Sequence, residues 1–158
     1  MAAIPYPVSA TDILTLKVAL AYNLAKFVTW PEQAKANEFF QFCYLSKAYE
    51  SGIEYLQGKK LHNKVIQKKY LKDLNQASVC DAIHISGANR VLLPRLLIAL
   101  NKSPTLTVSD SAGFIDNGGM LEIVSKDNRL QFKANRTAFE KAGLSIRSKA
   151  LKLALEVK

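Results

Sequence analysis

The sequence predicts a single α/β domain: a mostly parallel, mixed sheet with helices on both faces, followed by a C-terminal β-hairpin and helices. Two observations predict this class. Runs of β-forming residues alternate with helical-period segments through the first half of the chain, which is typical of parallel sheets. A length of 158 residues with 49% apolar and 22% charged residues suits one soluble domain. We assign 1–10 to an extended N-terminal lead and 11–158 to the domain.

The first element after the lead is a helix. Ser9 or Thr11 is placed to cap it, and apolar residues follow at helical spacing from Ile13 onward. The helix should end near Thr29, because a proline disfavours helical geometry at the residue before it. Trp30 and Pro31 are therefore predicted to form a corner, with the indole covering the end of the core.

Four strands and two helices are predicted next. The β-forming runs span 39–45, 65–70, 79–86 and 105–108, and the lysines of 65–70 indicate an edge strand. Residues 48–56 suit a short helix. A second helix, with Asn89 as its cap, carries the leucines up to Leu100.

The C-terminal third begins with a hairpin and ends with helices. Residues 120–125 and 129–132 flank the turn formers of 126–128. Asn135 is predicted to cap a helix that Gly143 ends, and apolar spacing over 146–157 predicts a final helix.

The stretch 107–120 predicts strand, glycine-rich loop, strand. Gly118 and Gly119 permit the positive φ that a sharp turn requires. One interpretation is a structural loop with a side-chain cap from Asp110. The other is a functional loop at the end of a sheet, where binding sites gather. The candidates for a partner-binding or switch surface are Asp110, Gly113, Phe114, Gly118 and Gly119.

Charge and motif content narrow the function classes. The net charge of +9 favours acidic partners, but the lysine-rich segment 59–72 has no arginine and only Tyr70 as an aromatic, which is less than a nucleic-acid reader needs, so we interpret it as a solvated surface. His62 lies in that segment, and His84 is interpreted as a packed core histidine. We expect no metal site, no cofactor and no catalysis, since metal spacings, phosphate loops and a nucleophile–base pair are all missing.

Neither a membrane-spanning run nor a signal peptide is found in the sequence. The chain is accordingly either cytoplasmic or a mature exported form. Cys43 and Cys80 fall in strands that are commonly neighbours, and residues alone leave two states open: a bridge, or two reduced and buried cysteines. A bridge would require an oxidising compartment.

Three motifs in order resemble the YfiR-like family. The segment 17–31 is similar to its opening signature, 108–120 to its central motif, and 132–135, 142–146, 148–151 and 153–154 to its C-terminal block. The motif residues are Tyr22, Asn23, Lys26, Phe27, Trp30, Pro31 and Asn135. Glu122 departs from the usual asparagine of the family, and Ala150 from a usual leucine.

The resemblance implies a periplasmic, non-catalytic signalling protein whose signal peptide has been removed. Such proteins often dimerise and repress an inner-membrane diguanylate cyclase in c-di-GMP signalling by binding its periplasmic domain. An OmpA-like outer-membrane lipoprotein can sequester them. The resemblance also implies a Cys43–Cys80 disulfide. Two roles stay open for the helix end and corner: a surface on which the glycine-rich loop packs, or simple maintenance of the fold. The residues concerned are Tyr22, Asn23, Lys26, Phe27 and Trp30. The alternative is a periplasmic small-ligand sensor that uses a crevice at the strand ends and acts on another partner, such as a sensor kinase.

Overall fold

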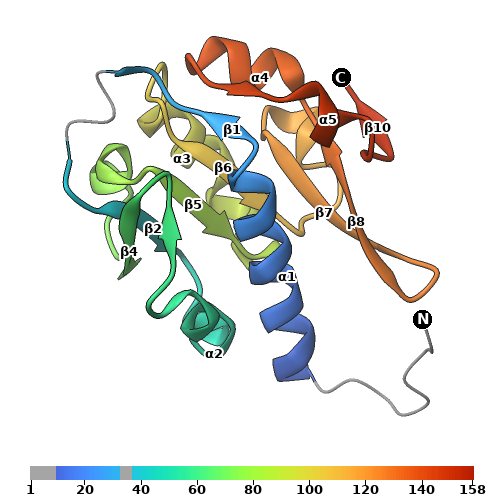
Figure 1. Ribbon diagram of the computed structural model, residues 1–158, viewed down its shortest axis with the longest axis horizontal. Helices are drawn as coiled ribbons and strands as arrows, with labels where there is room; N and C mark the ends of the chain where they lie inside the picture. Colours follow the sequence, from blue (N-terminus) through green and yellow to red (C-terminus); the bar gives the residue numbers. More distant parts are fainter. Residues whose placement is uncertain (1–9, 33–36) are drawn as a thin grey trace.

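A computed structural model describes residues 10–32 and 37–158 (Figure 1). The predicted lead, 1–10, falls outside the described residues except for Ala10, where the first helix begins, and so does the proposed cap Ser9. The α-helices are α1 (Ala10–Ala25), α2 (Glu50–Ile53), α3 (Leu93–Ala99), α4 (Arg136–Lys141) and α5 (Ser148–Leu151). Short 3-10 helices are η2 (Lys47–Tyr49), η3 (Glu54–Leu56), η4 (Leu74–Val79), η5 (Gly87–Leu92) and η6 (Ile115–Asn117).

The strands form one eight-stranded sheet and one two-stranded sheet. They are β1 (Val28–Thr29), β2 (Phe40–Tyr44), β3 (Lys60–Leu61), β4 (Lys64–Tyr70), β5 (Ala82–Ile85), β6 (Leu106–Ser109), β7 (Leu121–Lys126), β8 (Arg129–Ala134), β9 (Ser145–Ile146) and β10 (Glu156–Val157). The large sheet has the order β10-β8-β7-β6-β5-β2-β4-β3, and β1 pairs with β9 in the small one.

The large sheet is parallel from β4 through β2, β5 and β6 to β7, and β8 then returns antiparallel to β7. The β7–β8 turn places Asp127 and Asn128 at φ 53° and 62°, the left-handed pair that suits a two-residue hairpin. The predicted mixed sheet and hairpin are confirmed.

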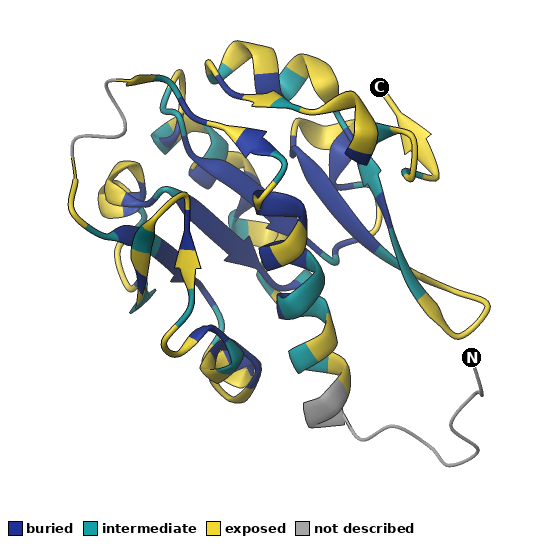
Figure 2. Cartoon of the chain, in the orientation of Figure 1, coloured by how far each residue is buried: buried dark blue, intermediate teal, exposed yellow. Residues whose placement is uncertain are grey.

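Each face of the sheet has its own hydrophobic cluster, because side chains alternate along a strand. Ala82 and Leu106 belong to the cluster that includes residues of α1, whereas Ile83 belongs to the cluster with Leu93 and Leu96 of α3. The central strands are buried on both faces (Figure 2). We call the two sides the α1 face and the α3 face.

Several predicted boundaries are wrong. The first helix ends at Ala25, and Val28–Thr29 is instead a strand paired with β9. The strand predicted at 79–86 begins only at Ala82, because η4 extends to Val79. The second helix is capped by Ser86, whose Oγ accepts from the Ala88 N–H, and not by Asn89.

The predicted final helix over 146–157 is also wrong. Only Ser148–Leu151 is helical, and Glu156–Val157 pairs with the exposed edge of β8. The strand predicted at the other edge, 65–70, is covered only at its start, where Lys64 and Val65 pair with β3.

Candidate functional site

Asp110 joins four parts of the chain at the carboxyl ends of β5 and β6. Its carboxylate accepts from Lys17 Nζ of α1 at 2.7 Å, from the Tyr49 hydroxyl at 2.6 Å and from the Gly87 N–H at 2.7 Å. These partners are 93, 61 and 23 residues away in sequence. Asp110 is therefore a long-range tie between elements, and the side-chain cap of the structural interpretation is made to the Gly87 N–H after β5.

The surroundings of Asp110 favour its charged form. Burial alone would raise the pKa of this carboxyl, but the hydrogen bonds from Lys17 and Tyr49, the Lys17 charge and the Gly87 N–H together hold the pKa below its usual value. Burial and the bond to Asp110 raise the pKa of the Tyr49 hydroxyl. At neutral pH the cluster therefore holds an anionic Asp110 and a protonated Tyr49 that donates to it.

His84 packs directly beside this tie. Its ring lies 4.4 Å from the Tyr49 ring, and the side chain is buried. Burial lowers the pKa of His84 to about 4, with the Asp110 charge opposing that shift and the Lys17 charge adding to it. Neither ring nitrogen has a hydrogen-bond partner in the part of the chain that the structure describes. The prediction of a packed core histidine is confirmed.

The glycine-rich loop, residues 110–120, covers buried polar side chains on the α3 face. Glu122 accepts from the N–H groups of Gly113 and Ile115 at 3.3 and 3.1 Å. Thr107 Oγ1 accepts from the Met120 N–H at 3.0 Å, and Asn135 Nδ2 donates to the Ile115 carbonyl at 2.8 Å. Side chains of the sheet and of the α4 cap therefore hold the backbone of the loop, as buried polar groups require.

The two adjacent glycines of the loop have different roles. Gly118 lies at φ 99°, so it supplies the predicted left-handed turn, as Gly113 does at φ 80°. Gly119 is not left-handed. A side chain at Gly119 would overlap the ring of Phe114, which is buried. The prediction of a left-handed Gly119 is wrong, and its small size serves close packing instead.

The motif residues at the end of α1 occupy the other face. Tyr22 donates to the Lys60 carbonyl at 2.9 Å beneath the Lys26 ammonium, and Trp30 donates to the Asp81 carbonyl at 3.1 Å. Tyr22 and Trp30 pack in the cluster of the α1 face, whereas Phe114 packs in that of the α3 face. Met120, at the end of the loop, shares the α1-face cluster with Tyr22 and Trp30, so the expectation that the loop packs against this helix end stays a prediction. The start of the loop meets α1 through Lys17.

The other motif residues that make contacts hold parts of the fold together. Trp30 packs edge-on against Phe40, with ring centroids 5.2 Å apart, which confirms the predicted indole cover. The Phe27 carbonyl accepts from the Arg147 N–H, Asn23 is exposed and Pro31 is half-buried. Asn135 caps α4 by accepting from the Ala138 N–H at 3.0 Å, as predicted.

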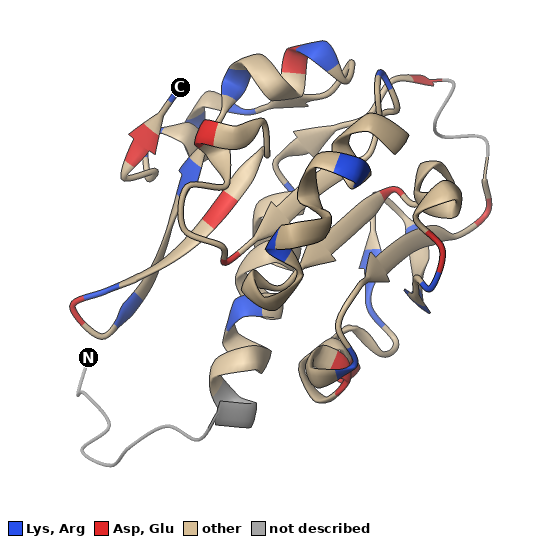
Figure 3. Cartoon of the chain, turned by 180° about the vertical axis from the view of Figure 1, so that it is seen from behind, with Lys and Arg blue, Asp and Glu red and all other residues tan. Residues whose placement is uncertain are grey.

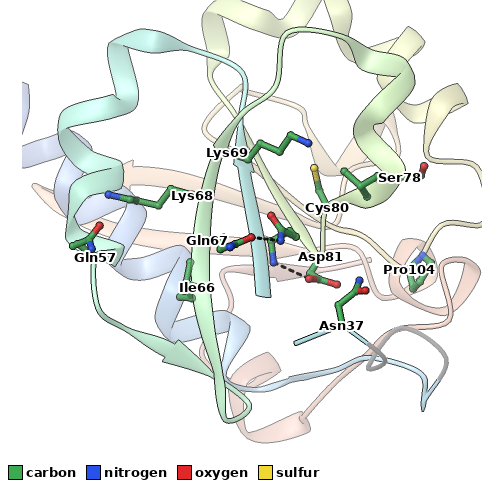
Figure 4. A pocket seen from close by; sticks show the side chains of 12 residues that line it. Asn37, Gln57, Ile66, Gln67, Lys68, Lys69, Ser78, Cys80, Asp81 and Pro104 are labelled. Atoms are coloured by element: carbon green, nitrogen blue, oxygen red, sulfur yellow. Dashed lines mark hydrogen bonds between the residues drawn. The ribbon is translucent and has the colours of Figure 1, made fainter. Parts of the chain in front are cut away.

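Cys43 and Cys80 form a disulfide with a Cα–Cα distance of 5.9 Å. Of the two states that the residues left open, the bridge is therefore confirmed. Cys80 also lines an open hollow of about 910 Å³ near the amino ends of β2, β5 and β6 (Figure 4). In this hollow the Asp81 carboxylate accepts from the Gln41 N–H at 2.8 Å. Burial raises the pKa of the Asp81 carboxyl. This hollow lies at the end of the sheet opposite to Asp110.

Sequence reasoning missed Lys17, Tyr49, Thr107 and the anchoring role of Glu122. Glu122 carried a signal, since it is a charged residue between the apolar residues Leu121 and Ile123 and departs from the family pattern. Among residues 10–32 and 37–158, no three His, Cys, Asp or Glu side chains group as metal ligands. No helix of that same part is long and apolar enough to cross a membrane.

Comparison with protein families matches residues 14–155 to the family described as YfiR/HmsC-like. No curated protein matches the chain. Two solved structures share the fold at 12% identity and a TM-score of 0.60: a conserved domain protein from Vibrio cholerae O1 biovar El Tor, and an ABC domain in complex with L-Trp from Streptococcus pneumonia. Each likeness covers 92% of this chain, which spans 60% of the solved chain. At this identity the likeness concerns the fold alone.

Proposed function

The chain belongs to the YfiR/HmsC-like family, and we propose that it binds and represses the periplasmic domain of an inner-membrane diguanylate cyclase, without catalysing a reaction. The family is one of periplasmic regulators of c-di-GMP signalling. The observation that carries the proposal is the family match over residues 14–155, almost the whole domain. The Cys43–Cys80 disulfide supports the compartment, because such bridges persist where the environment is oxidising.

The structure supports a role for the glycine-rich loop as a switch surface. Asp116, Asn117 and Gly118 are exposed at its tip, whereas Phe114 and Gly119 lie inside. We propose that the exposed tip meets the partner. Gly113 and Phe114 would maintain its shape, and Asp110 would tie the loop to α1. Phe114 would reach a partner only if the loop opened.

The test combines binding with signalling. The periplasmic domain of a diguanylate cyclase from the same genome, immobilised on a biosensor, should bind the purified protein. Deleting the gene should raise cellular c-di-GMP, and Asn117→Lys at the loop tip should weaken both effects. Lys126→Glu in the distant hairpin turn is the control substitution. A deletion strain with unchanged c-di-GMP, together with no binding, would refute the proposal.

Two further partners follow from the same membership. We propose a homodimer, and sequestration by an OmpA-like outer-membrane lipoprotein. Light scattering on the purified protein measures the first, and co-purification from detergent-solubilised envelopes measures the second. A monomer at all concentrations, or a lipoprotein absent from the eluate, would contradict the respective proposal. Cell fractionation tests the periplasmic location.

One observation favours the small-ligand sensor as a second candidate. A cavity of about 270 Å³ is lined by Trp30, Phe40, His62, Lys64, Asp81 and Arg147. Aromatic walls with two cationic side chains suit a small anionic ligand. A panel of anionic metabolites should then raise the melting temperature saturably, and Arg147→Ala should abolish that rise. If no metabolite of the panel raised the melting temperature, the small-ligand sensor would be refuted, and binding to a protein would remain as the proposed function.

A further inference from the structure

A groove lies between the end of α3, the glycine-rich loop and α4, where residues of both hydrophobic clusters meet. Its volume is about 380 Å³. The apolar lining comes from Leu97 of α3 and Leu100 just after it, Met120 at the end of the loop, and Ala138 of α4 and Ala142 just after it. Gly118 also lines it, so the groove is continuous with the glycine-rich loop.

Both charged residues that line this groove are basic. Lys102 and Lys141 line it, and none of its lining residues is acidic. In the described ranges neither lysine has an ion-pair partner. The segment 82–109, which includes α3, contains no Asp or Glu. In the view from behind, the charged residues on α3 are all basic (Figure 3). An occupant with negative charge is therefore favoured over a neutral or basic one.

Lys102 is held at this rim by an uncommon backbone conformation. It follows α3 at φ 62°, a left-handed position that glycine usually occupies at a helix end. A side chain at such a position costs about 1 kcal/mol. This backbone conformation sets the direction in which the Lys102 side chain leaves the backbone, at the rim of the groove.

One exposed apolar residue lies close to the groove in sequence. Ile98 is 76% exposed, next to the lining residue Leu97 and one turn before Lys102. A concave groove admits a protruding side chain, whereas the surface of a bilayer is flat, so the shape favours a protein.

We propose that this groove, with Lys102 and Lys141 on its rim, is the docking site of an acidic protein segment that inserts an apolar side chain. The anchor would lie between Leu97 and Ala138, and its flanking carboxylates would meet the two lysines. Because Gly118 and Met120 line the groove, occupancy would be felt directly by the glycine-rich loop. This inference rests on the proposed function in one respect, which is that it takes the molecule bound in the groove to be a protein.

The probe is a fluorescent twelve-residue peptide with Leu and Phe at its centre and Glu on both sides. Its controls replace every Glu by Lys, or Leu and Phe by Ser. The peptide should bind saturably and shift the amide resonances of residues 97–102 and 137–142. The Lys102→Glu/Lys141→Glu double variant should weaken binding about tenfold or more. Lys126→Glu/Arg129→Glu in the hairpin turn makes the same charge change away from the groove and should bind as the wild type does.

Three results would overturn the proposal. They are no saturable binding, amide shifts elsewhere on the protein, or equal weakening in both double variants, which would indicate net charge alone. Binding of vesicles containing anionic lipid that is lost only in the Lys102/Lys141 variant, with no peptide binding, would assign the surface to lipid instead. The peptide assay does not use the cyclase domain, so each proposal can fail without the other.

Discussion

Asp110 is the residue whose removal should disturb the site most directly. Asp110→Asn keeps the shape but loses the charge that Lys17 and Tyr49 bind. Since the tie is only partly exposed, we expect a loss of about 2 kcal/mol in the free energy of unfolding at pH 7. Urea unfolding measures it. Asp116→Asn, at an exposed loop position, is the control and should change stability much less.

The same pair of proteins tests the sign of the Asp110 pKa shift. A carboxyl whose folded pKa is depressed stabilises the protein above its unfolded pKa, and this contribution disappears as the pH falls through the folded value. The difference between wild type and Asp110→Asn should therefore be constant at neutral pH and shrink below about pH 4. A difference that persists undiminished in acid would contradict the ion pair as its cause.

His84 should make the protein sensitive to mild acid. Its pKa is lowered to about 4 by burial, so below pH 6.5 protons bind the unfolded chain in preference to the folded one. Stability should fall between pH 6.5 and 4.5, on the order of 3 kcal/mol over the full shift. His84→Phe should remove this slope, since the ring makes no hydrogen bonds in the described residues. Equal slopes in both proteins would refute the assignment.

Gly119 and Phe114 form a pair that a double-mutant cycle can test. Gly119→Ala should cost about 2 kcal/mol, because its methyl group meets the buried Phe114 ring. Gly118→Ala should cost about 1 kcal/mol through its left-handed φ, and its methyl group also meets the Leu97 side chain at 3.3 Å but not the Phe114 ring. Phe114→Leu should relieve Gly119→Ala but not Gly118→Ala. If Phe114→Leu relieved neither substitution, the overlap would not be the cause.

At the scale of single elements, Glu122 should hold the glycine-rich loop closed. Glu122→Gln removes the charge and leaves one carbonyl oxygen to accept from Gly113 and Ile115, so amide exchange at these two residues should accelerate about tenfold. Hydrogen exchange followed by NMR measures each amide separately. The Met120 amide, which donates to Thr107, is the internal control. Equal acceleration at Met120 would indicate global loss of stability instead.

The sequence predicted those elements whose signals are local. Asn135 caps α4 and Gly118 turns the loop because a side chain or a missing side chain acts within a few residues. The partners of Asp110 had no such signal, since Lys17 lies 93 residues away. Glu122 is an acid between buried apolar residues, which indicates that its carboxylate needs hydrogen-bond donors. The sequence does not indicate that amides of the loop supply them.

The wrong final helix has the same origin. The apolar spacing of 146–157 fits a helical period. That spacing carries no information about the backbone carbonyl groups at the edge of β8, with which the end of the chain pairs. Leu155 N–H donates to the Phe132 carbonyl at 2.8 Å and Lys158 N–H to that of Ala134 at 2.8 Å. Pairing with this edge extends the chain and leaves Leu153 73% exposed. β1 was missed likewise, since its two residues become a strand only by pairing with β9.

At the scale of the whole molecule, the two faces of the sheet carry separate features. The motif residues of α1 and the cavity at Trp30 lie on the α1 face, Phe114 of the glycine-rich loop packs on the α3 face, and the basic groove is lined by residues of both clusters. Lys17 and Asp110 connect α1 with the start of the loop.

The disulfide acts on the molecule as a whole, because it joins β2 to the start of β5 across 37 residues. In the chain-entropy account, closing such a loop stabilises the fold by about 4 kcal/mol. Cys43→Ser/Cys80→Ser should lower the urea midpoint accordingly, and reductant should shift the wild type toward the variant while leaving the variant unchanged. The decisive sample is protein taken from its native compartment and alkylated under denaturing conditions, with and without prior reduction. Thiols that react only after reduction would show that the bridge forms in the cell, which supports the proposed periplasmic location. Two thiols that react at once would mean that it does not, and the periplasmic regulator would lose its physical support.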